Sequence, residues 1–348
     1  GRYTEPQFAE LMVKEGRADL VAFGRQSLAD PAMPKKAQEE RLEDMTPCIA
    51  CLQGCVANMY AGNPVCCLTN PFLGHEAEPL EKAEEPKKVM VIGGGVAGLS
   101  AAFIAKERGH EVTLYEAGDV LGGNMRLAAY PPGKGDITNM IRSYIHRCQK
   151  DGVKIVMNCE VTPELIKEEK PDSVIIATGS KTLILPIEGI DNPAIIHGSD
   201  LLDGKRAAGK KVLVVGGGMV GCETAAFLGE QEHDVTVIEF RDTVGADVIH
   251  EHRVYLMKDF EDYGIKEITG AKVCKFYEDG VEYETADGVR HESRGYDSVI
   301  LSMGFRNYNP LEEKIKDLVP ETHVIGDAIR ARRALDATKE AYEVASRI

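Results

Sequence analysis

The sequence predicts an α/β protein with two Rossmann-like dinucleotide-binding domains, preceded by a cysteine-rich loop and the last βα unit of a TIM barrel. Three observations support this prediction. Two glycine-rich fingerprints stand in the same strand–turn–helix–strand context. Four closely spaced cysteines precede the first fingerprint. The chain begins with one helix, one apolar run and a second helix, which are too few elements to close a core alone.

Composition limits the classes of protein that fit. The 348 residues suffice for two to three domains. A net charge of -15 disfavours nucleic acid or an anionic membrane surface as partner. No apolar run approaches the ~18–20 residues of a membrane span, and the polar start carries no signal peptide. The nine cysteines are an odd number for disulfides, so we expect a cytoplasmic protein whose clustered cysteines bind metal.

The first predicted helix lies near the start of the chain. Thr4 and Gln7 fit a capping box, and Gly16 would end the helix. Its apolar face would consist of Phe8, Leu11 and Met12.

A predicted strand and a second helix follow, at residues 18–23 and 31–41. This order fits the last helix–strand–helix of a (β/α)8 barrel, whose loop after strand eight often binds a phosphate. Gly24 and Arg25 fall in that loop, where a glycine lets the backbone approach and an arginine clamps an oxyanion. Taken alone, this dipeptide is better explained as an ordinary surface turn. We expect residues 1–45 to form the C-terminal remnant of a barrel.

A metal-binding segment is predicted at residues 46–75, where the spacing is C-x2-C-x3-C-x11-C. The segment has little helical or strand pattern, so ligand bonds would replace the missing core. A four-cysteine zinc site is the alternative to a redox centre. The quartet consists of Cys48, Cys51, Cys55 and Cys67, with Cys66 as an adjacent competitor.

The first fingerprint is a strand from Lys88 that runs into G-x-G-x-x-G and then a helix. Gly93 allows the tight turn, Gly95 lets a pyrophosphate approach, and Gly98 packs the helix on the strand. The phosphate would bind at the helix N-terminus. The next strand ends in Glu116, which is placed to accept hydrogen bonds from ribose hydroxyls.

The second fingerprint repeats this pattern with Gly216, Gly218 and Gly221, and its second strand ends in Glu239. In each copy the acid lies 23 residues after the first glycine. A carboxylate at that position bonds a free 2′-hydroxyl and repels a 2′-phosphate. Glu239 therefore favours NADH over NADPH, although the nearby Arg241 keeps NADPH open.

Residues 173–179 and 298–304 predict a matching pair of strands, one in each nucleotide unit. A further strand ends at Asp327 and leads to a long helix from about residue 334. An aspartate there can hydrogen-bond a ribityl hydroxyl or simply cap a helix. The order of segments predicts one domain from 86–205 with 299–348, and an inserted domain at 206–298.

The chain resembles the C-terminal half of the 2,4-dienoyl-CoA reductase / 2-enoate reductase / trimethylamine dehydrogenase family, Old Yellow Enzyme-type barrels fused to an FAD/NAD(P) module. The matching segments span nearly the whole chain. They are ADLVAFGRQSLADP, PCIACLQGC, CLTNP, VIGGGVAGLSAA, LGGNMRLAAYPPGK, VIIATGS, VVGGGMVGCETA and IGDAIRARRALDA.

The resemblance implies that residues 86–205 with 299–348 bind FAD and that residues 206–298 bind NAD(P)H. It makes the cysteine segment an iron–sulfur loop in which the quartet holds a [4Fe-4S] cluster. Gly24 and Arg25 would contact the phosphate of FMN, most of whose barrel lies outside this chain. The implied FAD contacts are Ala97, Glu116, Gly123, Asn124, Lys134 and the backbone of Val161, placed on a strand. Asn124 replaces the usual glutamine but keeps both amide functions.

The expected activity is NADH-dependent reduction of an activated C=C bond in an enoate or enoyl-CoA. Electrons would enter through FAD and pass by way of the cluster to FMN. No residue here is a convincing proton donor, and the chain is also compatible with a homo-oligomer. Three alternatives stay open: a trimethylamine dehydrogenase-like electron-transfer module, a reductase subunit that feeds another protein, and a nucleotide-binding scaffold without activity.

Overall fold

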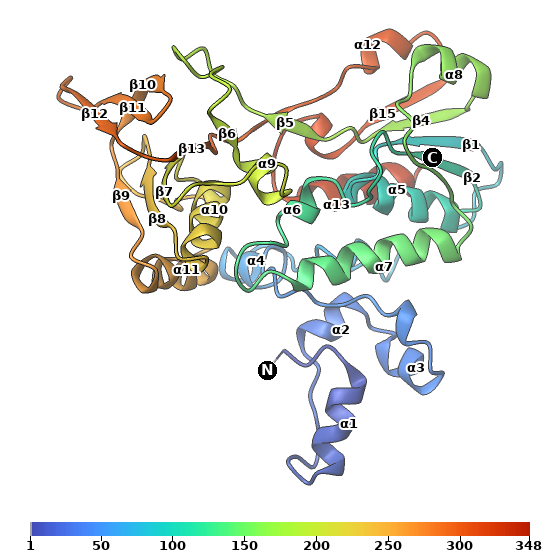
Figure 1. Cartoon of the computed structure of the whole chain (residues 1–348). Helices are drawn as coiled ribbons and strands as arrows, with labels where there is room; N and C mark the ends of the chain where they lie inside the picture. The colour runs from blue at the N-terminus through green and yellow to red at the C-terminus, as the bar shows by residue number, and fades with distance from the viewer. Residues whose placement is uncertain (1) are drawn as a thin grey trace. The chain divides into compact units, whose positions relative to one another are not determined.

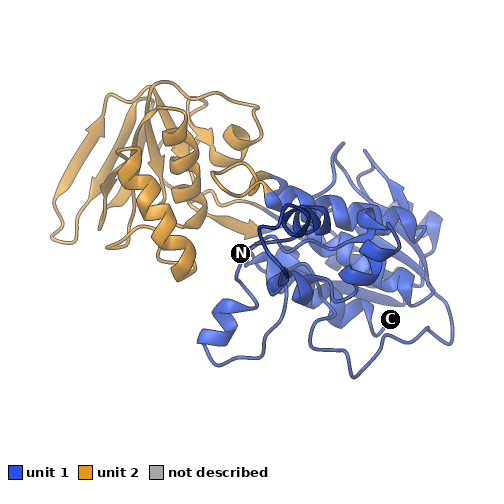
Figure 2. Ribbon diagram, turned by 90° about the horizontal axis from the view of Figure 1, so that it is seen from below, with its two compact units in different colours: residues 1–126, 136–180, 307–348 blue, residues 127–135, 181–306 orange. Residues whose placement is uncertain are grey.

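The computed structural model describes residues 2–348 as two compact units (Figures 1 and 2). Unit 1 comprises the described residues up to 126 together with 136–180 and 307–348, and unit 2 comprises 127–135 and 181–306. None of the helices in residues 2–348 combines the length and apolar character that a membrane crossing requires. The chain passes from one unit to the other at β5 (Ser180–Thr182) and again at β14 (Phe305–Asn307). These two strands form a two-stranded sheet.

Unit 1 contains a parallel five-stranded sheet in the order β15-β4-β1-β2-β3. Side chains alternate along β1, so Val89 and Val91 pack in one core cluster and Met90 and Ile92 in another. Helices α5, α7 and α13 cover the first face, and α8 and α12 cover the second. The strands are β1 (Lys88–Ile92), β2 (Glu111–Tyr115), β3 (Lys154–Val156), β4 (Ser173–Ile176) and β15 (Glu321–Val324); the helices are α5 (Val96–Glu107), α6 (Asn124–Leu127), α7 (Asp136–Lys150), α8 (Pro163–Glu169), α12 (Glu312–Ile315), η2 (Gly326–Ala328) and α13 (Ala334–Ala345).

Unit 2 repeats the arrangement with a parallel sheet in the order β6-β13-β7-β8-β9. Helices α9, α10 and α11 contribute to the cluster on one face of this sheet, and an antiparallel sheet, β10-β11-β12, packs against the other. The elements are β6 (Ile196–His197), α9 (Gly198–Leu202), β7 (Lys211–Val215), α10 (Met219–Glu230), β8 (Asp234–Ile238), α11 (His250–Asp262), β9 (Lys266–Ile268), β10 (Lys272–Tyr277), β11 (Gly280–Glu284), β12 (Arg290–Arg294) and β13 (Ser298–Leu301).

The domain limits differ from those predicted. Residues 181–205 and 299–306, expected in the FAD-binding domain, lie in unit 2, because β6 pairs with β13 in the second sheet. Residues 127–135 also belong to unit 2. The described part of 1–45 and all of 46–75, expected as separate domains, lie in unit 1.

The described residues before 75 form only short helices: α1 (Pro6–Lys14), α2 (Arg25–Ala29), α3 (Met33–Gln38), η1 (Leu42–Asp44) and α4 (Val56–Tyr60). The predicted capping box is wrong, because Glu5 is the N-cap and makes no side-chain cap hydrogen bond. The predicted strand at 18–23 is also wrong: no strand forms there, and Leu20 is 89% exposed. A strand requires a hydrogen-bonded neighbour, and residues 2–348 provide none for this segment.

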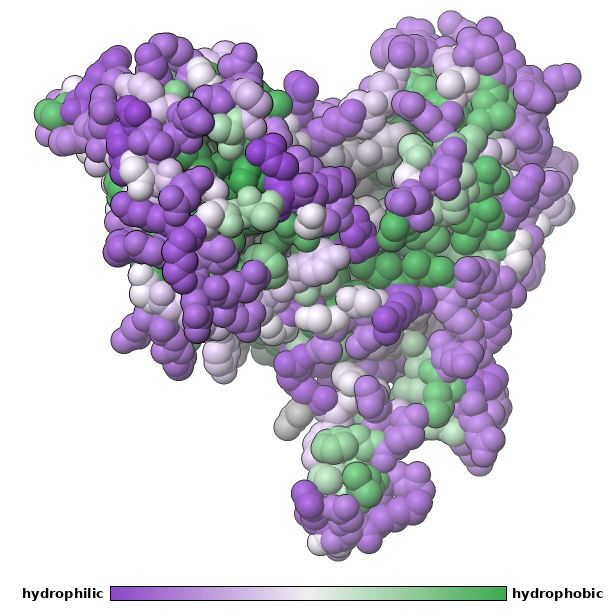
Figure 3. All heavy atoms as spheres, viewed as in Figure 1, coloured by the Kyte–Doolittle hydropathy of each residue, from purple (hydrophilic) through white to green (hydrophobic). Residues whose placement is uncertain are grey.

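Several large apolar side chains around α1 remain in contact with solvent. Only Met12 of the predicted apolar face is buried, while Phe8 and Leu11 are 50% and 44% exposed. Figure 3 shows apolar atoms gathered over the α1 end of the molecule. The described residues therefore cover only part of the apolar face of α1.

Candidate functional site

The first fingerprint forms the turn between β1 and α5. Gly93 adopts a φ of +111°, and a Cβ on Gly98 would collide with the carbonyl oxygen of Gly93. Both positions therefore need glycine. Gly95 is the N-cap of α5. Because glycine has no side chain, it cannot accept hydrogen bonds from the first amides of the helix.

Glu116 stands at the end of β2, beside this turn. Its Oε2 accepts a hydrogen bond from the Gly94 amide at 2.7 Å, and its Oε1 accepts one from the Gly118 amide at 2.7 Å. Glu116 and Val161 line a cavity of about 250 Å³. Val161 is buried, but it lies in the loop before α8 and not on a strand as predicted, because β3 already ends at Val156.

Several other predicted flavin contacts meet near the same turn in unit 1. The Asn124 Nδ2 group lies 3.3 Å from the Ser180 hydroxyl, which donates to Asp327 Oδ2 at 2.8 Å. A Cβ on Gly123 would lie 3.2 Å from the Gly95 Cα, and one on Gly326 would lie 3.0 Å from the Ala97 Cβ. The fold thus brings Gly95, Ala97, Gly123, Asn124 and Asp327 together, and their contacts with FAD stay predictions.

The second fingerprint forms the turn between β7 and α10 of unit 2. Gly216 adopts a φ of +106°, and a Cβ on Gly221 would collide with the Gly216 carbonyl oxygen. Glu239 Oε2 accepts from the Gly217 amide at 2.5 Å, and its Oε1 accepts from the Arg241 amide at 2.9 Å. Each acid therefore accepts a hydrogen bond from the amide of the residue that follows the first glycine of its fingerprint, Gly94 or Gly217.

Lys134 lies in unit 2, where it forms an ion pair with Glu223 of α10. Burial raises the pKa of Glu223, and the charge of Lys134 opposes that shift. Sequence analysis did not identify Glu223. The proposed contact of Lys134 with FAD stays a prediction.

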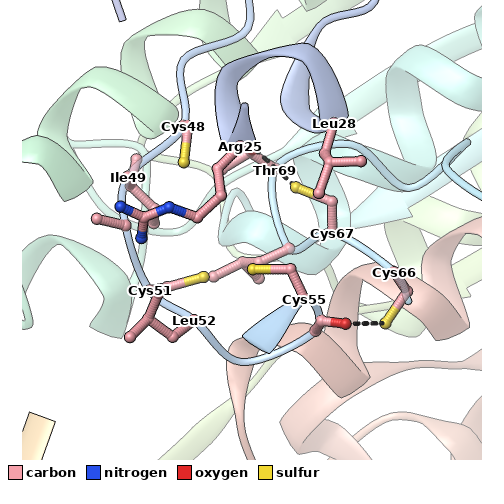
Figure 4. Close-up of a pocket in the computed structure, with 13 residues that line it drawn as sticks. Arg25, Leu28, Cys48, Ile49, Cys51, Leu52, Cys55, Cys66, Cys67 and Thr69 are labelled. Carbon is pink, nitrogen blue, oxygen red and sulfur yellow. Dashed lines mark hydrogen bonds between the residues drawn. The ribbon is translucent and has the colours of Figure 1, made fainter. Parts of the chain in front are cut away.

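The cysteine segment folds around a small pocket in unit 1. Figure 4 shows the sulfur atoms of Cys48, Cys51, Cys55 and Cys67 facing the space between them. The Cys66 sulfur instead lies 3.7 Å from the carbonyl oxygen of Gly54 and 3.3 Å from the Asn58 amide nitrogen.

The donor set of this pocket is suited to a cationic centre. Burial raises the pKa of Cys51 to about 12 and also raises the pKa of Cys67. No cluster of three or more His, Cys, Asp or Glu side chains in residues 2–348 has the arrangement of a metal site. A metal binds the thiolate and displaces the thiol proton, so these sulfurs would come to ligand distance only around the bound metal. The residues fit a four-thiolate centre, and the [4Fe-4S] cluster stays a prediction.

Residues from α2 hold the start of the cysteine segment. Gln26 is buried; its Nε2 donates to the Thr46 carbonyl at 2.9 Å, and its Oε1 accepts from the Cys48 amide at 2.8 Å. The buried Asp30 accepts from the Thr46 amide at 2.9 Å. Asn70, near the far end, donates to the Leu28 carbonyl at 2.9 Å. The roles of Gln26 and Asp30 were missed, because no local pattern marks their partners.

Gly24 and Arg25 have a modest structural role. Gly24 is the N-cap of α2, and Arg25 lines the cysteine pocket, where its side chain extends toward Cys48 and Cys51 (Figure 4). Their contact with the phosphate of FMN stays a prediction.

The cysteine segment also packs on the first nucleotide fold. Ile49 and Leu68 belong to the same core cluster as α5, α7 and α13. The buried Tyr144 hydroxyl of α7 donates to the Leu68 carbonyl at 3.1 Å, and the Leu335 amide of α13 donates to Gln53 Oε1 at 3.3 Å. The cysteine segment therefore lies between α2 and the helices that cover the first face of the unit 1 sheet.

Two dinucleotide folds, each with a glycine turn and an anchored acid, define an oxidoreductase that uses flavin and NAD(P)H. Residues 87–323 match the pyridine nucleotide-disulphide oxidoreductase family, and residues 1–44 match the NADH:flavin oxidoreductase / NADH oxidase family. The chain belongs to the 2-enoate reductase / 2,4-dienoyl-CoA reductase family, as a C-terminal portion that contains both matched segments.

Named relatives and a solved structure are similar over the whole chain. Cinnamate reductase of Clostridium sporogenes is 34% identical over 100% of this chain and 52% of its own length. NADH oxidase of Thermoanaerobacter brockii is 36% identical over 100% of this chain and 54% of its own. A 2-naphthoyl-CoA reductase in complex with 2-naphthoyl-CoA superposes with a TM-score of 0.95 at 34% identity, covering 99% of this chain and 53% of that one. The chain spans about half the length of the curated relatives it matches.

Proposed function

We propose that the chain is the electron-input part of an NADH-dependent flavin/iron–sulfur ene-reductase that acts on an enoate or enoyl-CoA. The observation that carries the proposal is the position of the cysteine pocket. It lies between α2, in the segment similar to NADH:flavin oxidoreductases, and the first fingerprint fold. When bound, FAD would supply two-electron hydride chemistry toward NADH, with the proton of the hydride kept by the flavin or released to solvent, and the [4Fe-4S] cluster would supply one-electron transfer toward FMN.

The residues of this chain would bind and orient those groups. The amides at the N-terminus of α5 would receive the FAD pyrophosphate, with Glu116 directed at the adenosine ribose. The N-terminus of α10 and Glu239 would do the same for NADH. The cluster ligands would be Cys48, Cys51, Cys55 and Cys67. The names of cinnamate reductase and 2-naphthoyl-CoA reductase support an unsaturated acid or its CoA ester as substrate.

The proposal is tested by anaerobic purification of this chain and four measurements: FAD content, iron content, dye reduction and cinnamate reduction. We expect one FAD and about four irons per chain, NADH-dependent reduction of an artificial dye, and no reduction of cinnamate. Reduction of cinnamate by this chain alone would contradict its assignment as the input part. A chain that retains only ADP at the first fingerprint would instead support a trimethylamine dehydrogenase-like module, and a colourless chain a scaffold.

A further inference from the structure

A carboxylate occupies the N-terminus of α10, where the second fingerprint would receive a pyrophosphate. Asp247 Oδ1 accepts a hydrogen bond from the Met219 amide at 2.9 Å. Its carboxyl group also faces the third position of the turn, since a Cβ on Gly218 would lie 3.5 Å from Asp247 Oδ2. The first amides of such a helix are the groups that bind phosphate oxygens. Asp247 thus takes a hydrogen bond that the nucleotide needs.

The internal repeat of the chain shows that this charge is not a general feature of the fold. Asp247 stands 31 residues after Gly216, and Asn124 stands 31 residues after Gly93. Unit 1 therefore carries the neutral amide of Asn124 at the corresponding position. The Asn124 Nδ2 group lies 3.3 Å from the Ser180 hydroxyl. Only the second unit places a formal negative charge there.

The surroundings of Asp247 in unit 2 are also acidic. Burial is the main cause that raises the pKa of Glu223, and the charge of Asp247 raises it further. The carboxylate of Glu239 accepts a hydrogen bond from the amide of Gly217, two residues before Met219. Lys134, paired with Glu223, supplies an opposing positive charge. A pyrophosphate that approaches the Met219 amide would meet the Asp247 carboxylate, which already accepts the hydrogen bond of that amide. The two negative groups would repel each other.

We propose that Asp247 is a carboxylate gate: it occupies the pyrophosphate-binding amide of α10 and must turn away before a dinucleotide can bind, so it lowers affinity for ligands that carry a pyrophosphate. This inference rests on the proposed assignment of the second fingerprint to NADH. The hydrogen bond to Met219 and the charge of the carboxylate are separable contributions, because an asparagine keeps an acceptor oxygen and removes the charge.

The test compares the wild type with Asp247→Asn, both saturated with FAD so that the first fingerprint is filled. Binding of NAD+, ADP and adenosine is measured by titration calorimetry. We expect Asp247→Asn to bind NAD+ and ADP about 10-fold more tightly, as expected when a like charge is removed from the phosphate position. Adenosine has no phosphate, so its affinity should not change. The control is Asp287→Asn, which removes one charge from the exposed β11–β12 turn of the same unit.

The outcomes separate the gate from the proposed function. If neither the wild type nor Asp247→Asn binds NAD+ or ADP, the second fingerprint has been wrongly assigned, and the gate proposal fails with it. A wild type that binds both while Asp247→Asn binds them equally or more weakly overturns the gate alone. Equal tightening of adenosine and ADP also overturns it, because the effect would then not act on the pyrophosphate. Thermal unfolding of each variant confirms that the comparison is between folded proteins.

Discussion

The side-chain oxygen of Gln26 accepts a hydrogen bond from the backbone amide of Cys48 at 2.8 Å. The Nε2 group of the same buried Gln26 side chain donates to the carbonyl of Thr46, so one side chain holds the backbone on both sides of Pro47. The conformation that presents the first cysteine is therefore set by a residue 22 positions earlier in the chain. This relationship makes α2 part of the cysteine site.

Replacing Gln26 with alanine should weaken the cysteine site. The change leaves the half-buried Thr46 carbonyl and Cys48 amide without their partner, which costs at most about 1–3 kcal/mol for each group left unsatisfied. We expect a lower melting temperature and less iron per chain, measured by thermal unfolding and iron analysis. Gln7→Ala, on the exposed side of α1, is the matched control. Unchanged iron content in Gln26→Ala would show that α2 does not position Cys48.

The five cysteines of the pocket should differ in their importance for the cluster. Cys51→Ser should lose most of the iron, because the Cys51 sulfur faces the common space and a neutral hydroxyl replaces a thiolate ligand (Figure 4). Cys66→Ser should retain iron, since the Cys66 sulfur lies beside the Asn58 amide and the Gly54 carbonyl, where a hydroxyl can also bond. Iron and acid-labile sulfide are measured in both. Loss of iron from Cys66→Ser with retention in Cys51→Ser would reverse the ligand assignment.

Glu239 should determine the choice between NADH and NADPH. Glu239→Gln keeps an acceptor for the Gly217 amide and removes the charge that would repel a 2′-phosphate. We expect the ratio of kcat/KM for NADPH to that for NADH to rise about 10-fold in dye reduction, the size expected for loss of one charge repulsion. Glu230→Gln, an exposed residue at the end of α10, should leave the ratio unchanged. A ratio that does not move in Glu239→Gln would remove this residue from nucleotide selection.

The ion pair between Lys134 and Glu223 should give a pH-dependent stability when it is broken. Burial already raises the pKa of Glu223, and Lys134→Met removes the charge that opposes this shift. An unfolded glutamate titrates near ~4.3, so the folded variant binds the proton more tightly than the unfolded chain. Its stability should therefore fall as pH rises from 5 to 8, by about 3 kcal/mol at the upper end.

The same measurement has an internal control. The double variant Lys134→Met/Glu223→Gln carries no ionisable group at the pair and should lose the added pH dependence. Denaturant unfolding at pH 5 and pH 8 compares the wild type with both variants. A single variant that is equally stable at the two pH values would show that the Glu223 carboxylate is solvated well enough to do without Lys134.

The nucleotide folds could be predicted in detail because their determinants are local. A glycine turn between β1 and α5 depends on the φ of Gly93 and on the clearance at Gly98, and these belong to one short segment. The same holds for Gly216 and Gly221. The spacing to Glu116 and Glu239 follows from a strand–helix–strand unit of regular length. Sequence was sufficient for these elements.

The remaining errors concern contacts between distant segments. The apolar run at 18–23 has strand composition, yet no neighbouring strand exists for it within residues 2–348. The short strand β6 could not be assigned to a sheet until its pairing with β13 was known. Lys134 could not be paired with Glu223, since 89 residues separate them.

By itself, the sequence determined that this protein has two dinucleotide-binding turns with their acids and a cysteine quartet, because backbone geometry and ligand spacing are written in short motifs. Only the tertiary structure decided that Gln26 holds Cys48, that residues 127–135 join unit 2, and that Asp247 lies on the first amide of α10. These are non-local contacts. Their partners are chosen by packing and by the need to satisfy buried polar groups, which no motif records.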